Sequence, residues 1–223
     1  MMSAKITHSE HYNEKYYNRQ KSGGAFGGRA NKFKFEDSIN SNDILVDFGC
    51  GGGFLLANIE CKGKIGIEPN SSARDDVINS GAEYFSSAEN ALSELGENYA
   101  DVIISNHALE HTHSPLLELK VLHKLLKIGG KIHFVVPFEG IKVQWKKNDI
   151  NYHLYTWSPM NLGNIFTEAG FKIERVAPIW HKWPPKYHLI AKISWNLFGI
   201  SSRIWARLRP NISQIEVVAV KSE

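Results

Sequence analysis

Residues 44–59 decide the fold, and they read Ile44-Leu-Val-Asp-Phe-Gly-Cys-Gly-Gly-Gly-Phe-Leu-Leu-Ala-Asn-Ile59. The apolar residues at the start predict a short strand that is buried on both faces. An acid, Asp47, and a loop with glycine at positions 49, 51, 52 and 53 follow. Residues 54–59 have the length and spacing of a short helix. A strand, a glycine turn and a helix in this order are typical of the opening of a nucleotide-binding α/β unit.

The spacing of the glycines narrows the class of ligand. A dinucleotide fingerprint needs glycine at its first, third and sixth positions, and counting from Gly49 the sixth position is Phe54. A phosphate-binding P-loop would end in Gly-Lys-Ser/Thr, and this loop does not. A further acid, Glu68, closes a second strand-like run about 20 residues beyond the loop, the separation that places a carboxylate over a ribose diol.

Four motifs, in residues 47–53, 66–70, 101–111 and 126–137, resemble the successive motifs of class I S-adenosylmethionine (SAM) methyltransferases. The resemblance implies a three-layer Rossmann-like α/β fold, with a mostly parallel seven-stranded sheet and an antiparallel last strand. It implies SAM as the cofactor and S-adenosylhomocysteine (SAH) as the product. The cofactor site that it implies consists of Asp47, Gly49, Cys50, Gly51, Gly53, Glu68, Pro69, Ala88, Glu89 and Asn106.

One position departs from the family. After the third strand, expected at 82–85, the family usually carries an acid that pairs with the adenine amine. This chain has Ser86-Ser87-Ala88-Glu89 there, so we expect the acid to be displaced or replaced by hydroxyls.

Length and composition favour one domain, residues 1–223, over two. The hydrophobic fraction of 43% supports a substantial core, and the net charge of +3 is too small to indicate a nucleic-acid partner. The two cysteines cannot supply a disulfide framework or a structural zinc site. The start of the chain lacks an apolar leader, and no run of 18 apolar residues occurs. We therefore expect a soluble cytoplasmic protein. The sequence does not indicate its oligomeric state.

Three histidines are the candidate catalytic groups. His111 follows the fourth strand, expected at 101–105, and is the candidate base or acceptor-orienting group, with His107 and His153 behind it. The alternative for His111 is a loop histidine that hydrogen-bonds to backbone. His107, His111 and His113 have permissive spacing for a metal, but only Glu110 accompanies them, so we expect no metal.

The methyl acceptor is expected to be a hydroxyl oxygen of a small molecule. Enzymes of this family that act on planar nitrogens resemble each other in an acid-or-Asn-Pro-Pro-aromatic tetrapeptide, whereas this chain has Ser-Asn-His-Ala at 105–108. Aromatic residues at 152–157 and the basic residues of the chain suit a saccharide or an anionic lipid-linked intermediate. The alternatives are an N-methyltransferase acting on a macromolecule, a non-catalytic SAM-binding or membrane-associating protein and, disfavoured by Phe54, a nicotinamide-dependent oxidoreductase.

The N-terminal segment, residues 1–40, is expected to cap the cofactor. Residues 8–20 predict a helix with one apolar edge, and the glycine-rich residues 22–28 predict a flexible loop. Tyr12, Tyr16 and Arg29 could then meet the methionine carboxylate or the substrate. The alternative is a docking helix and a linker.

The remaining elements follow from caps and periodicity. We expect helices at about 70–79, from 115 to the glycines at 129–130, and from 159 to Gly170, with strands at 131–136, 171–177 and 214–220. A long polar loop is expected at 138–157.

Residues 178–213 form an insertion between the last two strands. No acid lies between Glu174 and Glu216, and four of the six tryptophans fall in this segment. Apolar residues at helical spacing predict two helices that separate at Gly199. With a parallel sixth strand, the insertion would stand over the pocket as a lid. Residues 180–209 also suit peripheral contact with the inner face of an anionic membrane, and a dimer contact is the third alternative.

Overall fold

The structure is a computed structural model that describes residues 13–140, 142–147, 149–209 and 212–222. The strands are β1 (Ile44–Phe48), β2 (Gly63–Ile67), β3 (Glu83–Phe85), β4 (Ala100–Asn106), β5 (Leu126–Glu139), β6 (Lys172–Ile179) and β7 (Ile212–Val220). The α-helices are α2 (Glu14–Asn31), α3 (Arg74–Asn79), α4 (Ala88–Leu95), α5 (Pro115–Leu125), α6 (Pro159–Glu168), α7 (Tyr187–Ile193) and α8 (Trp195–Leu208). Short 3-10 turns are η1 (Lys32–Lys34), η2 (Glu36–Ser38), η3 (Leu56–Asn58), η4 (Ser71–Ala73) and η5 (Leu109–His111).

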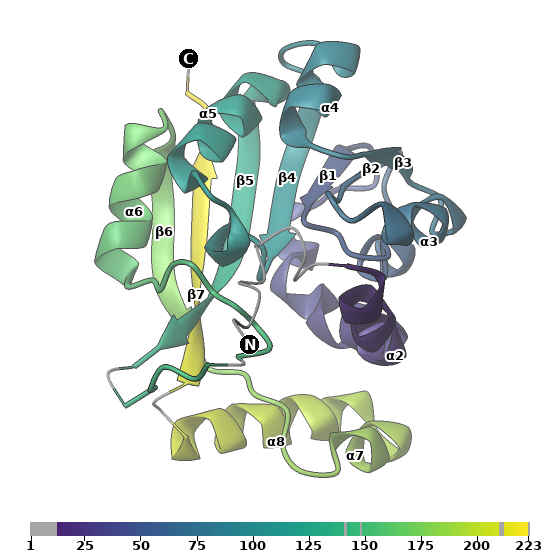
Figure 1. The fold of residues 1–223 in the computed structure, drawn as a ribbon, viewed down its shortest axis with the longest axis vertical. Coiled ribbons are helices and arrows are strands. Elements are labelled where there is room, and N and C mark those ends of the chain that lie inside the picture. The colour runs from purple at the N-terminus through teal and green to yellow at the C-terminus, as the bar shows by residue number, and fades with distance from the viewer. Residues whose placement is uncertain (1–12, 141, 148, 210–211, 223) are drawn as a thin grey trace, which may run out of the picture.

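The strands form one sheet in the order β3-β2-β1-β4-β5-β7-β6 (Figure 1). Strand β7 is antiparallel to β5 and to β6, and the other neighbouring pairs are parallel. The predicted fold class, with its antiparallel last strand and inserted helices, is therefore confirmed. Parallel strands end at the same edge of the sheet, so the loops after β1, β2, β4 and β5 converge there.

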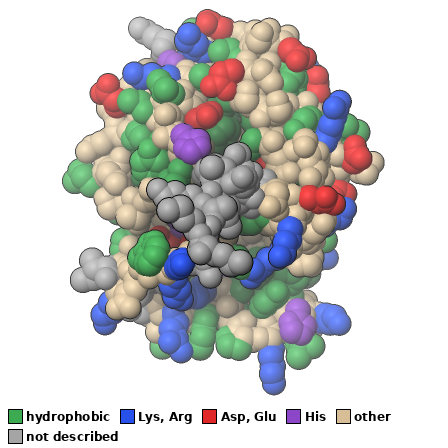
Figure 2. Space-filling model, viewed as in Figure 1, with side chains coloured by type: hydrophobic (Ala, Val, Ile, Leu, Met, Phe, Trp, Pro, Cys, Tyr) green, Lys and Arg blue, Asp and Glu red, His purple; other side chains and the backbone are tan. Residues whose placement is uncertain are grey.

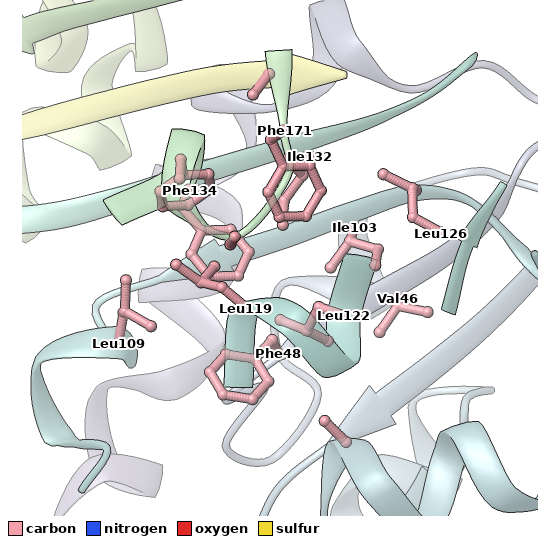
Figure 3. Close-up of a cluster of buried hydrophobic side chains, with 14 of the residues drawn as sticks. Val46, Phe48, Ile103, Leu109, Leu119, Leu122, Leu126, Ile132, Phe134 and Phe171 are labelled. Carbon is pink, nitrogen blue, oxygen red and sulfur yellow. The ribbon is translucent and has the colours of Figure 1, made fainter. Parts of the chain in front are cut away.

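Two apolar layers enclose the sheet. Side chains of β1, β4 and β5 pack against α4, α5 and α6 on one face, where Phe48 and Phe134 stack with ring centroids 5.9 Å apart (Figure 3). On the other face Leu45 packs with Phe35 and with residues of α3 and η3. Leu45 and its neighbour Val46 are both 0% exposed. The predicted burial of β1 on both faces is confirmed.

The segment after the glycine loop is not the helix that its spacing predicts. Residues 54–59 form turns and the 3-10 turn η3. The Asn58 side chain donates to the Phe54 carbonyl oxygen at 2.8 Å and so binds an acceptor that a helix would use. Two other boundaries differ from the prediction. Helix α5 ends at Leu125 rather than near the glycines at 129–130, because Leu126 is fully buried and already pairs with Ala100 in the sheet. Helices α7 and α8 separate at Ser194, which caps α8, rather than at Gly199.

The glycine-rich segment predicted as a flexible loop is helical instead. Residues 22–28 belong to α2. A Cβ at Gly24 would lie 2.2 Å from the Phe54 ring, and one at Gly28 would lie 2.0 Å from the Phe54 carbonyl oxygen. These two glycines, four residues apart, share one helix face. They let the helix approach the glycine-loop segment closely, and this tertiary contact outweighs their low helix propensity.

This packing predicts opposite effects for two glycines of α2. Gly23→Ala is expected to stabilise the protein by about 0.5–1 kcal/mol, because nothing lies within 4 Å of its Cβ position and alanine favours the helix. Gly28→Ala is expected to destabilise it by about 1–3 kcal/mol, because the methyl group meets a backbone carbonyl. Urea unfolding of the two variants checks both signs, and equal effects would contradict the close approach of α2.

The insertion packs on α2. Phe26 and Ala30 of α2 form an apolar cluster with Ala191 and Phe198, and the Phe26 ring stacks on Trp195 at 5.3 Å. Figure 1 shows α7 and α8 lying together across the end of the molecule to which β5 and β6 point. In the described part of the chain, no helix is both long and apolar enough to cross a membrane.

Candidate active site

The glycine loop bends sharply at the carboxyl end of β1. Gly49, Gly51 and Gly53 have φ values of 74°, 54° and 70°, the left-handed region in which a side chain is strained. A Cβ at Gly49 would also lie 2.2 Å from the Cβ of Ala108, because the loop is pressed against the segment after β4. The amides of Gly49 and Cys50 donate to the Ile67 carbonyl oxygen at 2.8 and 3.1 Å, which ties the loop to β2.

Glu68 holds this corner together. One carboxylate oxygen accepts from the Gly51 amide at 3.0 Å, and the other accepts from the Asn70 amide at 2.9 Å. Burial raises the pKa of Glu68, and these two hydrogen bonds partly oppose that rise. A carboxylate has about four acceptor sites, so two such bonds leave acceptor sites for the hydroxyls of a ligand.

A cavity of about 470 Å³ opens beside Glu68. Among the predicted cofactor residues, Gly49, Gly51, Glu68, Pro69 and Ala88 line it, and so do the predicted catalytic residues His107 and His111. The volume falls within the range of small-molecule sites, about 300–1,000 Å³. The glycine loop and the histidine loop therefore face one common space.

Five predicted cofactor residues do not line this cavity. Asp47 is 2% exposed, and burial together with Glu68 raises its pKa to about 7. Cys50 packs on Gly66, and Gly53 packs on Ser80. The Asn106 side chain points to the buried Lys34, whose ammonium donates to Asn106 Oδ1 at 2.8 Å. These residues support the loops, and the fifth, Glu89, lies in the first turn of α4.

Four residues that line the cavity, Gln20, Thr112, His113 and Glu118, were not predicted as cofactor or catalytic residues. Gln20 lies beside the predicted Tyr16, on the first turns of α2, and Thr112 and His113 follow His111. Ser86 and Ser87 line the cavity as the expected hydroxyls, and Ser87 also caps α4 by accepting from the Asn90 amide. Glu118 of α5 joins them, and burial together with Glu89 raises its pKa to about 7. The N-cap residue Ser87 is the sequence signal that could have revealed α4. No comparable signal marks Glu118, because a polar residue at its position in α5 is typical of any exposed helix position.

Two expected N-terminal contacts have different outcomes. Arg29 does not approach the cavity, because its guanidinium lies 4.4 Å from the centre of the Trp195 ring, on the insertion side of α2. Tyr12 lies outside the described residues. Of the two candidates that the structure describes, Tyr16 lines the cavity.

A buried carboxylate lies behind the histidines. Glu110 is 0% exposed, and its Oε1 atom lies 3.7 Å from His111 Nε2, 3.9 Å from His107 Nδ1 and 4.0 Å from His153 Nε2. Within the described residues neither carboxylate oxygen has a hydrogen-bond partner. Burial, with a smaller contribution from Glu139, raises the pKa of Glu110 to about 8. Burial also lowers the pKa of His107.

The loop after β5 brings His153 to this cluster without lining the cavity. The amides of Leu154 and Tyr155 donate to the Glu110 carbonyl oxygen at 2.9 and 3.3 Å, and His153 Nδ1 lies 3.0 Å from Glu139 Oε1. The rings of His153 and His111 meet edge to face, 4.9 Å apart. Trp157, expected to serve the substrate, is 4% exposed and packs in the core.

The same cluster has the dimensions of a cation site. The ligand atoms of Glu110, His111 and His153 lie within 4.8 Å of one another. Sequence spacing could not show this set, because His153 comes from a distant loop. The absence of a metal stays a prediction.

The raised pKa of Glu110 predicts how stability depends on pH. Between about pH 4.5 and about pH 8 the folded state keeps the Glu110 proton and the unfolded state loses it, so stability falls as pH rises. Glu110→Gln removes this contribution, which is on the order of a few kcal/mol. With a chelator present, the thermal midpoint is therefore expected to fall less for this variant than for wild type between pH 5 and 9. The control is the exposed Glu174→Gln, and parallel curves for wild type and Glu110→Gln would contradict the shift.

A family model described as "Methyltransferase domain" matches residues 26–176. The match covers more than half of the chain and includes both loops that line the cavity. The chain belongs to the methyltransferase-domain family. This membership confirms the predicted family, the class I SAM-dependent methyltransferases.

Relatives of this methyltransferase-domain chain have named functions. The ubiquinone biosynthesis O-methyltransferase of Ruegeria pomeroyi is 39% identical over 94 residues, which are 39% of this chain and 38% of that protein. The match thus spans less than half the length of that relative. A SAM-dependent methyltransferase of Thermotoga maritima aligns with a TM-score of 0.64 at 16% identity, covering 92% of this chain and 94% of that one. A geranyl diphosphate C-methyltransferase of Streptomyces coelicolor aligns with a TM-score of 0.60 at 15% identity, over 92% and 80%. At 15–16% identity, the similarity to these two solved structures shows the fold alone.

The residues that line the cavity fit SAM, the cofactor of this family. The glycine loop presents backbone that a Cβ would cover, and Glu68 presents a carboxylate with acceptor sites to spare. Tyr16 and Gln20 offer hydroxyl and amide groups from α2, and Glu118 offers an acceptor near Ser86 and Ser87. A polar nucleoside with an amino-acid tail thus finds partners along the whole cavity.

Proposed function

We propose that the protein transfers the methyl group of SAM to a hydroxyl oxygen of a small molecule. The observation that carries the proposal is the shared cavity, in which the glycine loop and Glu68 form one side and His107 and His111 another. A cofactor site and a candidate base therefore meet in one space.

The cofactor is proposed to lie along the glycine loop. The Glu68 carboxylate would accept from the ribose hydroxyls, as acids at the end of the second strand do in nucleotide-binding α/β folds. Ser86, Ser87 and Glu118 would serve the adenine, whose exocyclic amine needs an acceptor. SAM supplies a methyl group that its sulfonium has already activated.

The residues of the chain then have to position the acceptor and remove its proton. Holding two reacting groups at about 3–3.5 Å can contribute several kcal/mol. His111 is proposed to accept the hydroxyl proton at Nδ1, because Nε2 is the ring nitrogen near Glu110. Glu110 in its ionised form would stabilise the imidazolium, as the carboxylate does in a Ser-His-Asp triad. We therefore expect turnover to rise with pH up to about pH 8, where Glu110 ionises.

The acceptor class is proposed from the loop after β5, which contacts the histidine segment without lining the cavity. Tyr152, Leu154 and Tyr155 are each 38–41% exposed on the loop that carries His153, and the Tyr155 hydroxyl donates to the His113 carbonyl oxygen. Such aromatic surface suits a sugar ring or a lipid-linked intermediate, as the sequence indicated. The relatives named O-methyltransferases support an oxygen acceptor.

Two measurements test the proposal. Calorimetry with SAH on the full chain is expected to show one site per chain. Methyl transfer from labelled SAM is then measured on a panel of hydroxylated sugars, phenols and lipid-linked compounds, with matched amines as controls. A folded protein that gives no heat with SAH would refute the cofactor site, and transfer to amines alone would refute the oxygen acceptor.

A further inference from the structure

The α7–α8 pair carries a row of aliphatic side chains that the other described residues leave exposed. In α8 the exposed residues recur three or four positions apart, while Phe198, Ser202 and Ala206 are buried on the opposite side. In α7 two exposed residues are four positions apart. The row is between 45% and 78% exposed and comprises Leu189, Ile193, Leu197, Ile200, Ile204 and Leu208. We call these six side chains the outer face.

The outer face is bordered by positive charge. Residues 178–213 contain six lysines and arginines and no acid, while the net charge of the whole chain is only +3, so the remainder is net negative. Arg203 and Arg207 are exposed and four residues apart, on one flank of the row in α8. In Figure 2 the end where α7 and α8 lie shows blue and green side chains without red ones, whereas blue, green and red side chains are mixed over the rest of this view.

We propose that the outer face docks on an anionic lipid bilayer. A helix with an aliphatic face and flanking basic residues lies in a membrane interface, where the apolar side chains enter the acyl boundary and the cations meet anionic headgroups. Charge decides against two other occupants. A second copy of the same face would bring twelve cations together with no acid between them, and nucleic acid would leave the aliphatic row without a partner.

Docking at this face would place the active site near the bilayer. The α7–α8 pair packs on Phe26 and Ala30 of α2, and the first turns of the same helix supply Tyr16 and Gln20 to the cavity. Among the described residues, none of 178–213 lines the cavity, so the outer face and the active site are separate surfaces joined through α2. The proposal therefore does not depend on which acceptor is methylated.

Vesicle flotation of the full chain tests the proposal. Wild type is expected to float with phosphatidylcholine vesicles that contain phosphatidylglycerol and to remain free with phosphatidylcholine alone. Ile200→Glu/Ile204→Glu and, separately, Arg203→Gln/Arg207→Gln are expected to weaken the partition at least about tenfold. All four positions are exposed, so the variants should fold, and thermal unfolding checks this.

Two controls place an apolar-to-acid change and a loss of two positive charges elsewhere. Met160→Glu changes a side chain that is 73% exposed on α6, and Lys120→Gln/Lys124→Gln removes two exposed charges of α5. Both controls should partition as wild type does. The proposal is overturned by absent binding to anionic vesicles, by full binding of both outer-face variants, or by a dimer that Ile200→Glu/Ile204→Glu dissociates while vesicle binding is unchanged.

Discussion

Replacing His111 with alanine is expected to lower kcat for methyl transfer at least about 100-fold, while the affinity for SAH stays within about threefold of wild type. General bases contribute about 10²–10⁴ to rate, and the cofactor contacts lie on the glycine loop and Glu68 rather than on His111. Single-turnover transfer from labelled SAM and calorimetry with SAH measure the two quantities.

Two further measurements show whether His111 acts as a base. Imidazole added to His111→Ala should restore part of the lost rate, because it supplies the missing proton acceptor. In Glu110→Gln the rise of kcat toward pH 8 should flatten, because the group that ionises is gone. An unchanged kcat for His111→Ala would show that His111 is not the base, and His107 would then be the candidate base that remains in the cavity.

Replacing Glu68 with alanine is expected to weaken SAM and SAH binding by more than about tenfold. The change removes the proposed ribose acceptor and also the two hydrogen bonds that hold the Gly51 and Asn70 amides. Calorimetry with SAH gives the affinity, and circular dichroism confirms that the variant is folded.

The matched control for this prediction is Glu89→Ala. Glu89 was predicted from the family pattern to contact the cofactor, but it lies outside the cavity, so its removal should change SAH affinity by less than about twofold. A larger loss for Glu89→Ala than for Glu68→Ala would mean that the ribose and adenine contacts have been placed wrongly.

The sheet was predictable because its strands carry strong local signals. Leu45 and Val46 face opposite layers and are both apolar, and Ser114-Pro115 and Ser158-Pro159 announce helix starts that the structure confirms. The glycines of the loop after β1 require positive φ, which the spacing indicated. Gly49, Gly51 and Glu68, which the sequence proposed as cofactor residues, accordingly line one cavity, and their role in cofactor binding stays a prediction.

The remaining features depend on contacts between distant segments. Local composition cannot show that Gly24 and Gly28 lie against Phe54, and so a helix was taken for a loop. The loop after β5 brings His153 to Glu110 along a path that no periodicity reveals, and Glu118 lines the cavity from α5, which packs beside α4. Trp157 looked like a substrate aromatic, whereas the core buries it.

The position of β7 has a consequence for the order of assembly during synthesis. β7 is made after β6 but lies between β5 and β6, with nine residues paired to β5. Until β7 has left the ribosome, β6 has no neighbouring strand to pair with, and the nascent sheet can extend only from β3 to β5. The α7–α8 pair emerges in that interval, so its packing surface on α2 is available before the closing strand has been made. A premature stop before residue 212 would thus remove one strand and orphan another, leaving an open edge along β5.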